Sequence, residues 1–287
     1  MLTLISLLAQ HGAPAAEAHV IGGANPLVVA GIIFVITYAV IMSEKFNRAV
    51  VALLGGGLMI LSGVLSQHAA VQAIDWNTIG LLTGMMIIVA VMQRSGVFQY
   101  LAIWSAKKVN ARPWGILVML SIVTAILSAL LDNVTTVLLI APVTLLITEE
   151  LEIAPYPFLF SEIIFSNIGG AATLIGDPPN ILIGSMVESV TFNDFLVHIA
   201  PIVPLVFIAT LLPIYILWGR KLYASDEARQ RVLDFRESEA ITNPKLLIKS
   251  LAILILVLIG FVLGHPMGIE PATVAMTGAA LLLLLDN

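Results

Sequence analysis

Long apolar runs separated by short polar segments dominate this sequence. Runs of this kind extend over residues 26–42, 49–65, 76–92, 199–218 and 246–263, and another begins at 272. Several approach the roughly 20 consecutive apolar residues that a helix needs to cross a bilayer. Composition agrees, since 59% of the residues are hydrophobic and only 11% are charged. We therefore predict an all-α polytopic membrane protein.

One apolar run is interrupted between residues 169 and 180, which read Gly-Gly-Ala-Ala-Thr-Leu-Ile-Gly-Asp-Pro-Pro-Asn. Proline removes an amide donor and clashes with the preceding turn, and glycine weakens a helix. We therefore expect a broken helix over 158–188, with the backbone opened by Gly169, Gly170, Gly176, Pro178 and Pro179. Discontinuous helices mark the substrate and ion sites of secondary transporters. A surface loop or a structural kink is the alternative interpretation.

A second polar group, Leu131-Asp132-Asn133-Val134-Thr135-Thr136, separates the apolar runs 114–130 and 137–147. An ionisable residue in such a place is rare unless it faces a partner or a pathway. Polar interruptions in two neighbouring membrane segments therefore predict one shared site.

The positions of the basic residues predict the topology of the chain in the membrane. All thirteen Lys and Arg fall into three clusters, at 45–48, 94–112 and 220–249. The positive-inside rule places each cluster in the cytoplasm, so the chain crosses an even number of times between the last two. We predict that residues 114–148 form a re-entrant helical hairpin, with Asp132 at its tip opposite the broken helix. Two full spans would satisfy the parity equally well.

These segments divide the chain into four parts. Residues 1–25 are expected to form a mobile non-cytoplasmic tail, 26–219 a first transmembrane repeat, 220–247 a cytoplasmic linker with an amphipathic helix, and 248–287 the start of a second, inverted repeat. Residues 49–56 align with 272–279 without a gap and would begin on the opposite side of the membrane, as an inverted repeat requires. We expect the chain to be a fragment or a truncated product.

Several classes of function lack support in the sequence. No basic stripe interleaved with aromatic residues predicts nucleic-acid binding. The chain has no cysteine and its five histidines lie far apart, so we predict no resident metal and no cofactor. No nucleophile, base and orienting group are recognisable together, and we expect no enzymatic activity. The predicted partners are the lipid bilayer, protons, and a small inorganic ion or small anion.

The motifs Leu-Asp-Asn-Val-Thr-Thr and Gly-Asp-Pro-Pro-Asn resemble those of the ion transporter superfamily, in its P-protein and arsenite-permease branch. That superfamily also includes sodium/proton antiporters and citrate and dicarboxylate carriers. The resemblance implies two inverted repeats, each with a re-entrant hairpin and a broken helix whose tips meet near the middle of the membrane. It matches Asn133, Thr173 and Asn180 to positions at the tips of dicarboxylate carriers. We also expect a homodimer in the cell (inner) membrane.

Two positions depart from the dicarboxylate carriers, because Asp132 and Asp177 stand where those proteins have serine and threonine. Added acids would repel an anion and attract a cation, which favours cation (Na⁺)/proton exchange by alternating access. In this hypothesis the two aspartates carry the proton or Na⁺ alternately, and neutral oxygens come from Asn133, Thr135, Thr173 and Asn180. Alternatively, both acids are structural caps on broken helix ends.

Other interpretations remain open. Glu162 lies about 10 Å along a helix from the first glycine of the break, and it either relays protons or forms a hydrogen bond between helices. The second candidate function is an arsenite or carboxylate/oxyanion permease, in which backbone amides at broken helix ends hold the solute. A channel or a non-transporting membrane fragment is a third candidate.

Overall fold

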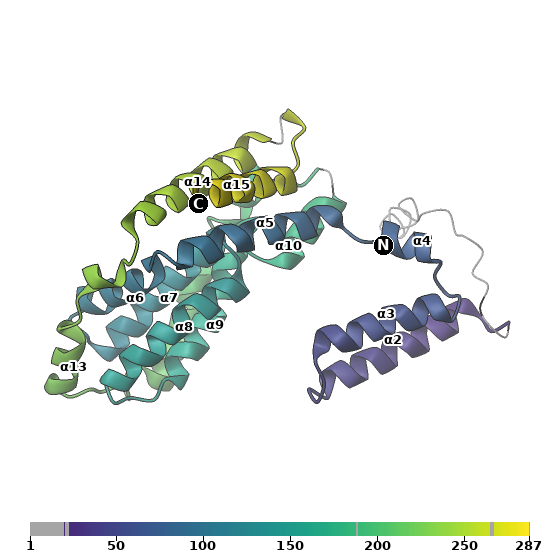
Figure 1. Ribbon diagram of the computed structural model, residues 1–287. Coiled ribbons are helices and arrows are strands. Elements are labelled where there is room, and N and C mark those ends of the chain that lie inside the picture. Colours follow the sequence, from purple (N-terminus) through teal and green to yellow (C-terminus); the bar gives the residue numbers. More distant parts are fainter. Residues whose placement is uncertain (1–19, 21–22, 188, 265–266, 287) are drawn as a thin grey trace. The chain divides into compact units, whose positions relative to one another are not determined.

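The computed structural model of the chain describes residues 20, 23–187, 189–264 and 267–286, and these residues form helices and connections without a strand (Figure 1). The chain divides into two compact units, residues 1–75 and 76–287. Most of the tail predicted over residues 1–25 lies outside the described residues. The all-α architecture predicted from the apolar runs is confirmed.

The first unit contains α2 (Pro26–Met42), α3 (Arg48–Leu61) and α4 (Gln67–Gln72). Helices α2 and α3 pack closely, since a Cβ atom on Gly55 would lie only 2.6 Å from the Thr37 hydroxyl oxygen. The second predicted span, 49–65, corresponds to α3 and ends earlier than predicted, at Leu61. Helix α3 ends because Gly63 takes a φ of +76°, which a regular right-handed helix does not allow.

The second unit holds the remaining helices, of which η1 and η2 are π-helical and η3 is a 3₁₀ turn. In chain order they are α5 (Trp76–Gln93), α6 (Val97–Lys108), α7 (Pro113–Leu130), α8 (Asn133–Glu150), α9 (Tyr156–Gly170), α10 (Pro178–Met186), α11 (Phe192–Asp194), η1 (Phe195–Ile199), α12 (Val203–Ile214), η2 (Tyr215–Gly219), α13 (Asp226–Leu233), η3 (Glu237–Ala240), α14 (Pro244–Gly264) and α15 (Pro271–Asp286).

Among the described residues, four helices are long and apolar enough to cross a bilayer: α5, α7, α8 and α14. A fifth span results if the bent pair Phe192–Ile199 and Val203–Gly219, which turns through 54°, counts as one. Asn110 and Ala111 have φ values of +53° and +50°, so helix α6 ends at Lys108.

Helices α7, α8 and α9 form a three-helix group in which α7 runs parallel to α9 and α8 runs antiparallel to it. The Ser128 hydroxyl near the end of α7 donates to the Ser166 carbonyl near the end of α9, 2.6 Å away. Helix α8 starts beside Asn167, where the side chain of Asn133 donates to that residue's amide oxygen. Farther along α8, Thr144 hydrogen-bonds to Glu162, which comes earlier in α9. The chain therefore reverses direction between α7 and α8.

Both ends of this reversed segment meet the linker helix α13. Arg231 forms ion pairs with Glu150, the last residue of α8, and with Glu152 just beyond it. Arg229 donates to the Asn110 carbonyl before α7. The segment thus returns to the end from which it started, as the charge clusters predict. A re-entrant hairpin and two full spans both have this geometry, so the hairpin over 114–148 stays a prediction.

The second and third basic clusters lie at the same end of the unit. Arg94 pairs with Asp286 at 2.7 Å, and Lys107 pairs with Glu237 at 2.6 Å. The hydrogen bond from Lys107 lowers the pKa of the Glu237 carboxyl, so the folded linker favours its ionised form. The linker predicted over 220–247 contains the short helix α13, and α14 begins at Pro244, slightly earlier than the predicted boundary at 248.

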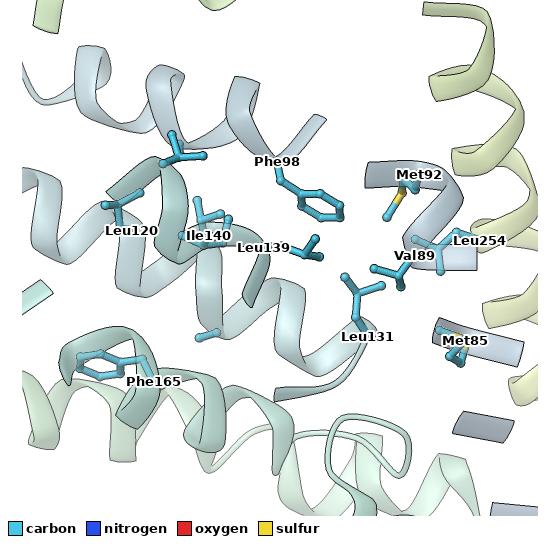
Figure 2. Packing of buried hydrophobic residues seen from close by; sticks show 14 of the residues in the cluster. Met85, Val89, Met92, Phe98, Leu120, Leu131, Leu139, Ile140, Phe165 and Leu254 are labelled. Carbon is cyan, nitrogen blue, oxygen red and sulfur yellow. The ribbon is translucent and has the colours of Figure 1, made fainter. Parts of the chain in front are cut away.

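Helices α5, α14 and α15 pack against one another and form a second layer beside the three-helix group (Figure 1). Gly84 lets α15 approach α5, because a Cβ there would lie 2.7 Å from the Ala275 backbone. Between the layers the core is apolar, and Figure 2 shows Leu131 pointing toward Val89 of α5. Leu131 is only 1% exposed, so its burial anchors the turn between α7 and α8.

Candidate ion site

The turn between α7 and α8 presents a carboxylate at the start of a helix. Leu131 leaves the helical conformation with φ −113° and ψ −99°, and Asp132 is extended. The Asp132 carboxylate accepts a hydrogen bond from the Thr135 amide at 2.8 Å, so it caps α8. The side chain is 6% exposed. The structural cap expected for Asp132 is therefore present, but this bond occupies only one carboxylate oxygen.

The predicted break is present between α9 and α10, over residues 171–177, and side chains hold it in shape. The Thr173 hydroxyl donates to the Ala129 carbonyl at 2.6 Å and accepts from the Gly176 amide at 3.1 Å. The Asn180 amide donates to the Thr173 carbonyl at 3.0 Å and to the Gly170 carbonyl at 3.4 Å. These bonds satisfy backbone groups that the break would otherwise leave without partners.

Glycine is required where the break touches its neighbours. A Cβ on Gly169 would collide with the backbone of Ala125, and a Cβ on Gly176 would lie 2.7 Å from the Ser128 carbonyl oxygen. The backbones of Gly170 and Gly176 also face each other within the break. Pro178 and Pro179 then start α10, where a missing amide hydrogen removes no helical bond.

The two interruptions meet, as the sequence predicts. The backbone N–H of Asn133 donates to the Gly176 carbonyl at 3.2 Å, and the side-chain amide of Asn133 donates to the Asp177 carboxylate at 3.3 Å. Asp177 occupies the position before α10 but forms no side-chain capping bond. The starts of α8 and α10 therefore converge, each with an aspartate, and Asn133 bridges them.

Asn167 belongs to this cluster and was missed by the sequence interpretation. Its amide oxygen accepts from Asn133 at 3.0 Å, while its own nitrogen donates to the Ile163 carbonyl at 2.7 Å. The only available signal was an amide side chain within an apolar run. Thr135 is half-buried, and its contribution to the cluster is the backbone amide that donates to the Asp132 carboxylate.

Glu162 lies apart from the cluster, five residues before Asn167 and so roughly 7.5 Å along α9. It is 1% exposed, and the Thr144 hydroxyl donates to one of its carboxyl oxygens. The hydrogen bond between helices, one of the two expectations for this residue, is therefore present. In the part of the chain that the structure describes, no three of His, Cys, Asp and Glu gather as metal ligands.

A cavity of about 370 Å³ adjoins the break on the side of α10 and α14. Its lining includes Leu174 and Ile181, which neighbour Thr173 and Asn180 in sequence, and the carboxylate-bearing residue Glu270. A small solute in this cavity would lie close to the broken backbone.

Interrupted apolar helices whose starts converge on two carboxylates define a polytopic membrane protein of the transporter type. The chain belongs to the CitMHS citrate transporter family, whose model matches residues 38–287, and this family is part of the ion transporter superfamily. The superfamily resemblance drawn from the two motifs is thereby confirmed.

Relatives agree with this assignment. An uncharacterized transporter of Mycobacterium tuberculosis is 45% identical over 264 residues, which are 91% of this chain and 61% of the relative. The 46 kDa membrane protein of Mycobacterium leprae is 44% identical over 267 residues, again 91% and 61%. The human P protein is 40% identical over 196 residues, 65% of this chain and 23% of that protein. The chain thus spans about 61% of the length of its mycobacterial relatives.

Proposed function

We propose that the protein is a secondary transporter that exchanges a monovalent cation such as Na⁺ for protons by alternating access. The observation that carries this proposal is the convergence of two helix starts, each bearing an aspartate, on the bridging side chain of Asn133. Membership of a transporter family supports the general class. The choice of ion rests on the charge of the site.

The balance of charge favours a cation. Each helix start carries roughly half a positive elementary charge, so two of them supply about +1. Two ionised aspartates supply −2, which leaves the site at about −1. One proton or one monovalent cation neutralises that charge, whereas a carboxylate substrate would add to it. Serine and threonine in place of Asp132 and Asp177 would leave a net positive site, which suits an anion.

The remaining side chains have distinct roles in this proposal. Asn133 holds the two helix starts together and orients the Asp177 carboxylate. Thr173 and Asn180 use their donors on backbone carbonyls, so they hold the break in the shape that brings Asp177 to the cluster. Thr135 contributes through the amide that orients Asp132. Carboxylate and carbonyl oxygens are the ligands that hard cations prefer.

The second candidate is an arsenite or carboxylate permease. The specific observation in its favour is the pair of helix starts itself, since backbone amides at such ends bind anions. It requires that both aspartates be neutral when the solute binds. In either case we propose that the intact protein acts in the cell (inner) membrane as a homodimer and catalyses no chemical conversion.

A flux assay separates the two candidates. The native-length protein is reconstituted into liposomes with an internal pH dye, the interior is made acidic, and Na⁺, Li⁺ or K⁺ is added outside. We expect one or more of these cations to collapse the gradient, since cation entry must be balanced by proton exit. Uptake of labelled citrate or arsenite, without collapse by any cation, would contradict the exchange mechanism and support the permease.

A further inference from the structure

The buried side-chain atoms without a hydrogen-bond partner gather in one part of the fold. Among the described residues there are five such atoms, all of them oxygens and all on α7, α8 or α9: Ser121 Oγ, Thr124 Oγ1, Asn133 Oδ1, Thr136 Oγ1 and Glu162 Oε2. Buried polar atoms normally have partners, so this concentration indicates that the three-helix group encloses a polar interior that can bind a proton, water or a small cation.

Glu162 is the one ionisable residue among these five. One of its two carboxyl oxygens, Oε2, has no hydrogen-bond partner. Thr144 reaches Glu162 from the antiparallel helix α8. A hydroxyl of α8 therefore contacts this buried carboxyl group, and its second oxygen is left for a proton.

On the described helices that pack most closely on α9, no basic side chain balances this carboxyl group. Thr124, Thr144 and Glu162 are at most 1% exposed. The helices that pack on α9, namely α7, α8 and α12, contain no Lys, Arg or His, and their nearest acids are Glu149 and Glu150 at the far end of α8. A bare carboxylate in such surroundings is costly, so the group requires a proton or a cation.

We propose that Glu162 is a proton-binding site separate from the Asp132–Asp177 cluster and that it holds the proton that is exchanged for the cation. This inference rests on the proposed function. Because the Thr144 hydroxyl donates to Oε1, the proton binds to Oε2, the oxygen without a partner. When the cation binds at the cluster, this proton leaves to the aqueous phase through the hydroxyl-lined interior, and Glu162 is left as a carboxylate. Along α8, Thr136 lies between Asn133 of the cluster and Thr144 at Glu162, and its hydroxyl oxygen has no partner.

Infrared difference spectroscopy tests this site without knowledge of the transported ion. We expect the native-length protein in liposomes to show a protonated-carboxyl band that Glu162→Gln removes and that Thr144→Val shifts by removing the hydroxyl donor. Glu149→Gln is the matched control, since it removes the same charge from an exposed position at the end of α8 and should leave the band unchanged. In the flux assay, Glu162→Gln should lose proton movement driven by cations.

The possible results have distinct meanings. A band that persists in Glu162→Gln, or cation-driven proton movement that survives this substitution, would overturn the assignment of the proton to Glu162. A third result is possible, in which Glu162→Gln loses the band but the unmodified protein moves no cation. That result would support the proton site and contradict cation exchange. The Thr144→Val spectrum keeps the test valid if Glu162→Gln does not fold.

Discussion

Replacing Asp177 by asparagine is expected to abolish cation-driven proton movement while the protein stays folded. The Asp177 carboxylate forms no capping bond, and its side-chain hydrogen bond among the described residues comes from Asn133, so it is available to a cation. Asparagine keeps the size of the side chain and can still accept that hydrogen bond through its oxygen. It removes the negative charge on which cation binding depends. The measurement is dye-reported gradient collapse in liposomes, with a loss of about 100-fold or more if roughly 3 kcal/mol of charge stabilisation is removed.

Asp226→Asn provides the control for this substitution. Asp226 lies in the linker helix α13, its side chain is 96% exposed, and it pairs only with the nearby Arg229. The same change of charge there should leave transport intact, because surface ion pairs contribute little. Full cation-driven exchange by Asp177→Asn would mean that Asp177 is a structural residue and would contradict its assignment to the ion site.

Replacing Gly176 by valine is expected to prevent the two interruptions from meeting. An added Cβ would lie 2.7 Å from the Ser128 carbonyl oxygen and 2.8 Å from the Gly170 Cα, and backbone atoms on both sides cannot move aside cheaply. Overpacking typically costs about 1–3 kcal/mol, and we expect this substitution to reach at least the upper end of that range. The measurement is the thermal unfolding midpoint of the purified protein, together with the yield of monodisperse material.

Gly56→Val is the matched control, because a Cβ at Gly56 in α3 meets nothing within 4 Å. That substitution should change the midpoint little. An unchanged midpoint in Gly176→Val would show that the break can open without cost and would contradict the close contact between the break and the start of α8.

The break and the polar turn could be predicted from sequence because their causes are local. Pro178, Pro179 and Gly176 cannot continue an ordinary helix in any context, and Asp132 stands out in an apolar run. The linker helix, and the location of two basic clusters at the same end of the second unit, could likewise be predicted from the positions of charged residues. These features depend on residue type and position more than on distant contacts.

The partners within the site could not be predicted in the same way. Asn167, Ser166 and Thr144 lie in apolar runs where a polar side chain can face lipid, another helix or a cavity, and only the packing of α7, α8 and α9 decides which. The π-helical turns at 195–199 and 215–219 also left no clear signal, because they widen helices whose apolar pattern continues unbroken. The inverted repeat stays a prediction, since its proposed copies lie in different units.

Proton release on cation binding tests the central claim most directly. The purified native-length protein is held in weakly buffered solution with a pH indicator, and Na⁺, Li⁺, K⁺, citrate or arsenite is added. If cation binding at the Asp132–Asp177 cluster releases a proton from the protein, addition of the transported cation acidifies the solution of the unmodified protein but not that of Asp177→Asn. Binding of citrate or arsenite, with no proton released by any of the three cations, would contradict cation/proton exchange.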